Sequence, residues 1–237
     1  MKHIILITTY NRLNLLKKCM ESLWNTIEQG TPIFVVNDGS KQETTNYLYE
    51  CMSKNLIDVV INSKINMGIS PSISSGMNYI FDFVRFFSAD RRKEFKPYIS
   101  YIQDDMLFTK KNWPSYCIEK FSQAKKLVDV DFMTGFDFSY EFDENNHPRI
   151  HKDITLEGCH FRKSMSGQHM MASIDTWKER LPVPTFRDGS VVRGHPHNGI
   201  GSCVDWWLIR DSKPSKTLAV ENIAIYDGKK KSTWQSF

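Results

Sequence analysis

Continuous apolar runs alternate with segments of helical periodicity through the first 135 residues. Short apolar runs are typical of strands buried on both faces of a sheet, whereas spacing such as Leu16, Met20 and Leu23 is typical of a helix. The pattern predicts strands over residues 3–7, 33–36, 58–62, 97–103 and 132–135. It predicts helices from about residue 12 to before residue 30, then over 40–54, 70–87 and 110–128. This alternation predicts a mostly parallel sheet with helices on both faces, which binds ligands at the carboxyl ends of its strands.

Polar residues mark the starts of these helices. Asn11 or Asn14 can cap the first helix, and Ser40 or a near neighbour can cap the second. Pro71 falls in the first turn of the third helix, where its missing N–H costs nothing.

The pattern becomes irregular after about residue 136, where segments are shorter and richer in His, Gly, Pro and aromatic residues. Helices over 168–180 and 202–211 are the clearest elements that it predicts there. Neither an internal repeat nor a low-complexity linker divides the chain. We therefore expect one domain over residues 1–237, with a regular half (1–106) and an irregular half (107–237).

Composition narrows the class of protein. With 41% hydrophobic and 24% charged residues, the 237-residue chain resembles an ordinary globular protein. Its five cysteines are scattered and never form a CxxC pair, which argues against a disulfide framework and a cysteine-rich zinc site. No run is long enough to span a bilayer, and the chain enters a strand at once, so we expect no signal peptide and a soluble, cytoplasmic protein.

The net charge of +4 is modest, but basic residues cluster at Arg91–Lys93 and at Lys229–Lys231, the latter near Trp234. Such clusters can bind phosphate backbones, and they are also common as solvated surfaces. The charge pattern therefore permits a nucleic-acid partner without requiring one.

Three polar clusters follow successive predicted strands: Thr8–Arg12, Asn37–Ser40 and Gln103–Asp105. The adjacent carboxylates of Asp104 and Asp105 repel each other unless a cation lies between them, and a divalent ion that also binds a phosphate is the usual cation; a solvated acidic turn is the alternative. The chain has neither a GxGxxG turn after its first strand nor a GxxxxGK[ST] loop. The clusters therefore indicate a nucleotide site that holds phosphates mainly through metal.

Taken with Asn66-Met67-Gly68 before the third helix, these clusters resemble the motifs of the GT-A glycosyltransferases, particularly family 2, in order and spacing. The resemblance implies that Thr9, Tyr10 and Arg12 line the pocket for base and phosphate. It also implies that Asp38 accepts the N3–H of a uracil, although an Asx turn that shapes the loop is the alternative.

Further roles implied by the resemblance concern the wall of the base pocket and the metal. Asn66 and Gly68 would form the base-side wall, unless they only start the helix. Asp104 would contact the ribose or the metal, and Asp105 would bind Mn²⁺ or Mg²⁺ directly. A third metal ligand would come from His197, with His195 and His169 as other candidates, or from water.

The resemblance is looser in the second half. Gly167–Met171, which includes Gln168, resembles the segment that lines the cleft for donor sugar and acceptor. Gly199–Trp207 resembles the glycine-rich stretch that leads to the catalytic base. Asp205 is the carboxylate available there and would be the base, with a helix cap as the alternative. Trp206 would stack on a sugar or base.

The resemblance thus implies a GT-A type α/β fold and a metal-dependent, inverting glycosyltransferase. Its donor would be a nucleotide sugar, most readily UDP-linked, bound by the first half, and its acceptor would be a hydroxyl held by the second half. A saccharide, a small molecule and a hydroxylated base in DNA are all candidate acceptors. A nucleotidyltransferase and a non-catalytic module that binds sugar nucleotides or nucleic acid are the alternatives from other classes.

Overall fold

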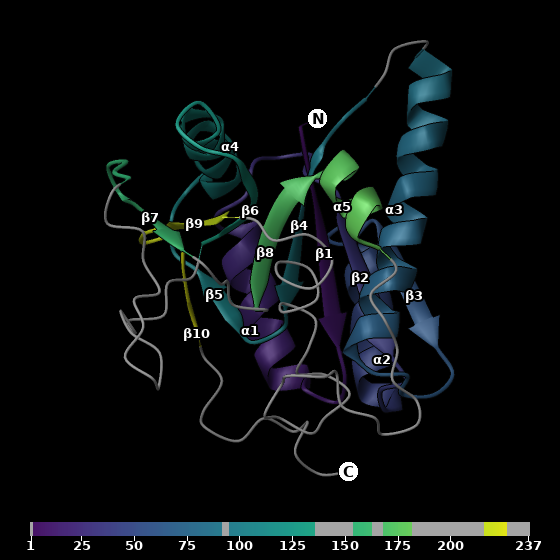
Figure 1. Cartoon of the computed structure of the whole chain (residues 1–237). Coiled ribbons are helices and arrows are strands. Elements are labelled where there is room, and N and C mark those ends of the chain that lie inside the picture. The colour runs from purple at the N-terminus through teal and green to yellow at the C-terminus, as the bar shows by residue number, and fades with distance from the viewer. Residues whose placement is uncertain (1, 92–94, 136–153, 163–167, 182–215, 227–237) are drawn as a thin grey trace, which may run out of the picture.

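A mixed eight-stranded sheet forms the centre of the part of the chain that the computed structural model describes, namely residues 2–91, 95–135, 154–162, 168–181 and 216–226 (Figure 1). The strand order is β3-β2-β1-β4-β8-β6-β9-β7, and β5 and β10 form a separate pair. The strands are β1 (His3–Thr9), β2 (Ile33–Asp38), β3 (Val59–Ser63), β4 (Tyr98–Gln103), β5 (Met106–Phe108), β6 (Val130–Thr134), β7 (Cys159–Arg162), β8 (His169–Ser173), β9 (Lys216–Val220) and β10 (Ala224–Tyr226). The helices are α1 (Leu13–Trp24), α2 (Gln42–Ser53), α3 (Ile69–Arg91), α4 (Trp113–Ala124) and α5 (Ile174–Arg180).

Four parallel strands, β3-β2-β1-β4, make up the part of the sheet that the sequence predicts best. In the centre of this part, Ile5 of β1 pairs with Ile33 of β2 and with Ser100 of β4. Because these strands run in one direction, their carboxyl ends lie at one edge of the sheet. The expected α/β fold with a mostly parallel sheet is confirmed.

The other half of the sheet is mixed, because β8 runs antiparallel to both β4 and β6 and β7 runs antiparallel to β9. The helix predicted over 168–180 is wrong in its first part, since residues 169–173 form β8 and the helix begins only at Ile174. Residues 169–172 are buried, as expected for a strand covered on both faces, and Ser173 caps α5 by accepting a bond from the Thr176 N–H. Residues 202–211 lie outside the described part.

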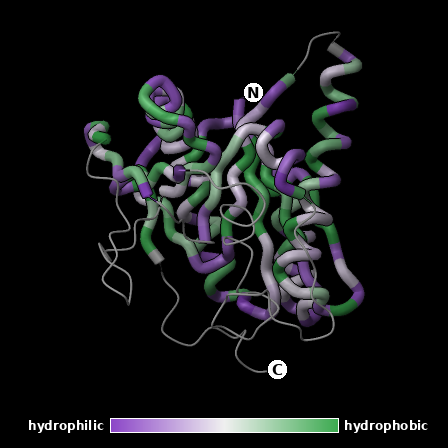
Figure 2. The backbone as a smooth tube through the Cα atoms, in the orientation of Figure 1, coloured by the Kyte–Doolittle hydropathy of each residue, from purple (hydrophilic) through white to green (hydrophobic). Residues whose placement is uncertain are grey.

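Two apolar layers cover the sheet, and all seven residues of β1 are buried between them. Ile5 and Ile7 face the layer that contains α1, α2 and α4, whereas Ile4 and Leu6 face α3 and α5. Figure 2 shows the central strands as mostly hydrophobic and the helices as mixed, as expected for amphipathic helices that cover a sheet.

Gly76 lets α3 lie close to the sheet. A Cβ atom at this position would lie 2.5 Å from Cδ1 of Leu6 and 2.9 Å from Cγ2 of Val36, both of which are buried. The contact holds the first half of α3 against β1 and β2, while Figure 1 shows the other end of α3 extending past the sheet. Among the described residues, no helix has the length and apolar character that crossing a membrane requires.

Candidate functional site

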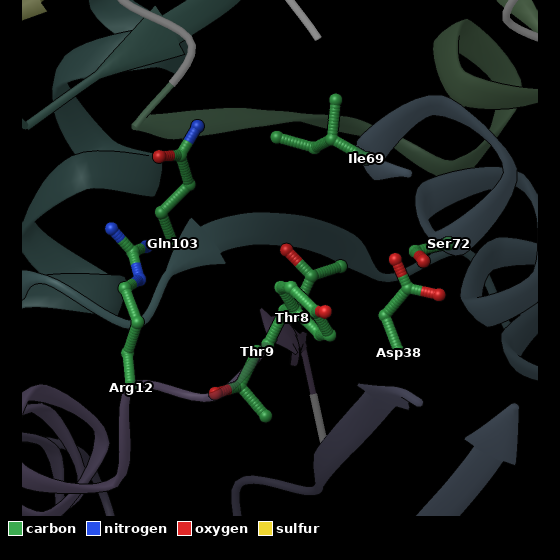
Figure 3. Close-up of a pocket in the computed structure, with 8 residues that line it drawn as sticks. Thr8, Thr9, Arg12, Asp38, Ile69, Ser72 and Gln103 are labelled. Atoms are coloured by element: carbon green, nitrogen blue, oxygen red, sulfur yellow. The ribbon is translucent and has the colours of Figure 1, made fainter. Parts of the chain in front are cut away.

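A pocket opens where β1, β2 and β4 end, at the edge at which the sequence places its polar clusters. Its lining comprises Thr8, Thr9, Tyr10, Arg12, Asp38, Ile69, Ser72 and Gln103. Figure 3 shows Arg12 and Gln103 on one side, Asp38 and Ser72 on the other, and Thr8 and Thr9 between them. Side chains from three neighbouring strands and from the start of α3 therefore meet at one place.

The two adjacent carboxylates lie between β4 and β5, and Arg12 pairs with both of them. Arg12 Nη1 donates to Oδ2 of Asp105 at 2.7 Å, and Nη2 donates to Oδ1 of Asp104. Thr9 Oγ1 donates to the other oxygen of Asp104 at 2.5 Å. Because β1 lies beside β4 in the sheet, the turn after β1 brings these donors to the carboxylates.

Burial sets the electrostatics of this cluster, since Asp104 is 0% and Asp105 is 2% exposed. Burial raises the pKa of Asp104 to about 6, although the Arg12 guanidinium and the Thr9 hydroxyl both act to lower it. Burial alone would lower the pKa of Arg12, but the two carboxylates raise it above its ordinary value. The cluster therefore holds an arginine that stays charged and an Asp104 carboxyl that titrates close to neutral pH.

The carboxylates suit a hard divalent ion as a pair of oxygen ligands. Oδ1 of Asp105 is buried and has no hydrogen-bond partner among the described residues, which leaves this oxygen available to a cation. Within the same residues, no group of three or more His, Cys, Asp and Glu side chains is placed to hold a metal. Asp104 and Asp105 thus fit a metal that takes its other ligands from phosphate, from water or from residues outside the described part.

Asp38 ends β2 and fixes the loop that leads to α3. Its Oδ1 accepts from the Met67 N–H at 2.8 Å and its Oδ2 accepts from the Gly68 N–H at 2.9 Å. Burial raises the pKa of Asp38, while these two backbone donors act to lower it. Asp38 therefore shapes the loop and also lines the pocket.

Asn66 and Gly68 lie in this same loop, beside Asp38. Oδ1 of Asn66 accepts from the Gly68 N–H at 2.9 Å, as in an Asx turn. Gly68 has a φ of +92°, a conformation that residues with a Cβ rarely adopt, so the backbone itself requires glycine here. The role of these two residues as a base-side wall stays a prediction.

Asn11 and Ser40 join the loops after β1 and β2 instead of capping helices. The Asn11 N–H donates to Ser40 Oγ at 3.0 Å, and the Lys41 N–H donates to Asn11 Oδ1 at 2.8 Å. Helix α1 begins after Arg12 and α2 after Lys41, and neither of these residues makes a side-chain cap. The caps predicted at Asn11 or Asn14 and at Ser40 or a near neighbour are therefore wrong: Asn14 lies inside α1, and Asn11 and Ser40 join the loops after β1 and β2.

His169, one of the histidines considered as a metal ligand, belongs to a buried network. Its Nδ1 accepts from the Gly135 N–H at 2.8 Å, so Nε2 carries the proton and faces Ser100 Oγ at 3.2 Å. The same hydroxyl lies 2.9 Å from Nε2 of His3. Because both ring nitrogens of His169 are engaged and the side chain is 0% exposed, the structure gives it a role in the core.

The structure thus brings together Thr9, Tyr10, Arg12 and Asp38 around the pocket, with Asp104 bound to two of them. The backbone carbonyl of Gln168 accepts from the Gln103 N–H at 2.9 Å, which places Gln168 beside a residue that lines the pocket. The predicted base Asp205, the stacking candidate Trp206 and the candidate ligand His197 lie outside the described residues.

Two residues that line the pocket, Ile69 and Ser72, were missed by the interpretation of the sequence. Both belong to the first turn of α3, directly after Asn66-Met67-Gly68. Their position just after a motif that follows a strand was the available signal, because a helix that starts at the carboxyl edge of a sheet turns its first residues toward the ligand.

A family model shows the family of this chain, and solved structures show its fold. The family model for Glycosyl transferase family 2 matches residues 4–187. Among solved structures, S. aureus TarS 1-349 in complex with UDP-GlcNAc is 12% identical, with a TM-score of 0.61 over 100% of this chain and 61% of that one. GalNAc-T7 with UDP, GalNAc and Mn²⁺ is also 12% identical, with a TM-score of 0.59 over 92% of this chain and 42% of that one.

At such low identity the structural likeness concerns the fold, and it confirms the GT-A type α/β architecture expected from the sequence. The chain spans 61% and 42% of the length of these two solved chains, so it corresponds to only part of each. Comparison with curated proteins gives no match.

Proposed function

The chain belongs to glycosyl transferase family 2, and on that premise we propose that it transfers a sugar from a UDP-linked donor to a hydroxyl acceptor, with the help of Mn²⁺ or Mg²⁺. The observation that carries the proposal is the pocket at the carboxyl ends of β1, β2 and β4, which Arg12 and Asp38 line, together with the buried carboxylate pair that Arg12 binds beside it. Residues 1–106 would hold the donor, and residues 107–237 would hold the acceptor. Family membership favours glycosyl transfer over nucleotidyl transfer and over binding alone.

A uridine nucleotide suits the polar groups of the pocket. Asp38 would accept the uracil N3–H, since each carboxylate oxygen has two lone pairs and the backbone N–H groups of Met67 and Gly68 use one each. Thr9, Tyr10 and Arg12 would line the pocket for the base and the phosphates. The complexes of TarS with UDP-GlcNAc and of GalNAc-T7 with UDP support this choice of nucleotide through a shared fold.

Asp104 and Asp105 would hold the divalent cation with oxygen ligands, and His197 would be a further ligand. When bound, the cation would neutralise the charge that develops on the leaving diphosphate. Oδ1 of Asp105, buried and without a hydrogen-bond partner in the described part of the chain, supports this assignment. The presence of Mn²⁺ in the GalNAc-T7 complex supports it through the shared fold.

Asp205 would act as the general base that takes the proton from the acceptor hydroxyl, so that attack from the opposite face inverts the anomeric carbon. Trp206 would stack on a sugar or a nucleobase, and Gln168 would line the cleft for donor sugar and acceptor. The position of Gln168 beside Gln103 supports a cleft that continues from the donor pocket along β8.

A thermal-shift screen of UDP-, GDP- and ADP-sugars, each with and without Mn²⁺, tests the donor. Binding to the folded state stabilises it by about 2.7 kcal/mol at one hundred times the Kd, so the UDP-sugars with Mn²⁺ should raise the melting temperature most. The same samples are then assayed for UDP release with saccharide, small-molecule and hydroxylated DNA acceptors. Release of pyrophosphate, or no stabilisation by any nucleotide sugar, would contradict the proposal.

A further inference from the structure

Arg12 places one positive charge between two carboxylates that the proposed function assigns to a metal. Its two terminal nitrogens donate to Oδ1 of Asp104 and to Oδ2 of Asp105, so one oxygen of each carboxylate is bound to the guanidinium. The three side chains are nearly buried, with exposed fractions of 10% for Arg12, 0% for Asp104 and 2% for Asp105. This arrangement is a forked, charge-assisted pair of the kind that arginine makes best.

A divalent cation cannot simply join this arrangement. A cation bound by Asp104 and Asp105 would lie within a few ångströms of the guanidinium, and like charges that close in a buried setting repel strongly. Mg²⁺ and similar ions also need oxygens in a near-ideal octahedron, whereas the guanidinium fixes two of the four carboxylate oxygens in its own geometry. The cation and Arg12 therefore compete for the same pair.

The Arg12 side chain can bind a ligand instead of the two carboxylates, because it also lines the pocket. Its guanidinium can donate in the same forked way to a phosphate. Its backbone is held independently of the side chain, since the Arg12 carbonyl accepts from the Leu16 N–H at 2.9 Å and the side chain makes no helix cap. The side chain can thus turn toward a ligand without disturbing the start of α1.

We propose that Arg12 is an internal competitor of the divalent cation: it pairs with Asp104 and Asp105 until the diphosphate of a nucleotide draws its guanidinium away, so that cation and nucleotide bind cooperatively through this one side chain. The proposal rests on the proposed function, because it takes the nucleotide diphosphate as the competing anion. By linkage, the factor by which UDP tightens Mn²⁺ binding equals the factor by which Mn²⁺ tightens UDP binding.

The central experiment measures Mn²⁺ binding by electron paramagnetic resonance and calorimetry, with and without UDP, in the wild type and in Arg12→Met. The variant keeps a long side chain but no charge. In the wild type, Mn²⁺ alone should bind weakly, and UDP should tighten its binding by about fivefold or more. In Arg12→Met, Mn²⁺ alone should bind about fivefold or more tightly than it binds the wild type, and UDP should add a smaller factor.

Stability gives a second readout, because Arg12→Met leaves two buried carboxylates without their cation. Its melting temperature should fall, and Mn²⁺ without nucleotide should restore a large part of the loss. Arg180→Met is the matched control, since Arg180 of α5 is 2% exposed and pairs with the carboxylate of Asp131 in β6. The control should also lose stability, but Mn²⁺ should not restore it.

Arg12→Lys keeps the test decisive if Arg12→Met does not fold. Lysine retains the positive charge but cannot span both carboxylates with a planar fork, so Mn²⁺ alone should bind it more tightly than it binds the wild type. Equal affinity of Mn²⁺ for the wild type and either variant would overturn the proposal, as would weaker binding to the variants. A wild type that binds no UDP in the presence of Mn²⁺ would instead contradict the proposed function.

Discussion

At the scale of single residues, Arg12 decides the charge balance of the site. The two carboxylates beside it would carry a net charge of −2, and the guanidinium reduces this to −1 within a nearly buried cluster. Burying an unpaired charge is costly, whereas a pair with good hydrogen-bond geometry is tolerated. Removing one carboxylate therefore leaves a balanced pair, which makes it a clean test of metal binding.

We predict that Asp105→Ala removes metal-dependent binding of UDP while the protein stays folded. Arg12 and Asp104 remain as a neutral pair, and the oxygen of Asp105 that lacks a partner among the described residues is lost. Calorimetry with UDP and Mn²⁺ provides the measurement. Asp82→Ala is the control, because Asp82 is an exposed residue of α3. If the Asp105 variant keeps the full effect of Mn²⁺ on UDP affinity, the metal assignment is wrong.

We predict that Asp205→Asn changes donor affinity by no more than a few-fold but lowers the rate of sugar transfer by about two to four orders of magnitude, as is typical of losing a positioned base. The amide has nearly the same shape as the carboxylate but cannot take a proton. Steady-state kinetics and UDP calorimetry on the same preparation separate the two effects. A variant with a near wild-type rate would show that Asp205 is a helix cap and that the base lies elsewhere.

The sequence predicts the members of the pocket better than their contacts. Thr9, Arg12 and Asp38 were assigned to the site because they follow strands, and all three line the pocket. The ion pairs of Arg12 could not be predicted, because they depend on β1 lying beside β4 in the sheet. The hydrophobic pattern of a sequence does not determine the order of the strands. The assignment of Asp205 as the general base rests on the family resemblance alone, since this residue lies outside the described part of the chain.

At the scale of elements, predictions from the local sequence are wrong where a side chain binds a neighbouring loop instead of capping its own helix. Asn11 and Ser40 have the chemistry of caps, yet they bind each other's loops. Residues 169–173 show apolar positions that suit a helix, yet they form β8, because β4 and β6 offer strand edges on both sides. Both errors have one cause: contacts with other loops and strands stabilise these segments more than their local preference for a helix cap or a helix does.

Gly76 offers a test of packing between an element and the sheet. At an exposed position inside a helix, replacing glycine by alanine stabilises the folded protein by about 1 kcal/mol. Here the new Cβ would press on Leu6 and Val36, and overpacking costs about 1–3 kcal/mol. We predict that Gly76→Ala lowers the free energy of unfolding measured in urea, whereas Asn78→Ala, at an exposed position of the same helix, leaves it unchanged or slightly raises it. Stabilisation by Gly76→Ala would show that α3 can move away from the sheet.

At the scale of the whole molecule, two buried histidines make stability depend on pH. Burial lowers the pKa of His169 to about 3, and it does the same for His3, where the neighbouring His169 adds to the effect. In the unfolded chain both pKa values return to about 6.5. Between pH 6.5 and about 3 the unfolded state therefore binds more protons than the folded state. These two histidines lower the free energy of unfolding as the pH falls through that window.

We predict that His169→Gln makes the free energy of unfolding less sensitive to acid over this window. Each histidine contributes up to about 1.4 kcal/mol per pH unit. The comparison of wild type and variant cancels titrating groups that His169 does not affect, such as Asp104, and it also includes the small rise in the pKa of His3 that follows from losing its neighbour. Urea unfolding at several pH values between about 7 and 4 provides the measurement. Two curves that stay parallel over this range would show that the network tolerates a charged His169.

The position of β1 between β2 and β4 has a consequence for how the chain folds during synthesis. His3 of β1 and its hydrogen-bond partner Ser100 of β4 are 97 residues apart. At about 5–20 residues per second, a ribosome needs roughly 5 to 20 seconds to make that interval. During this time a strand that is buried on both faces in the finished protein has only β2 as a neighbour, and its other edge is open. We therefore expect the nascent chain to depend on chaperones until β4 emerges, and slower translation between β3 and β4 to increase aggregation.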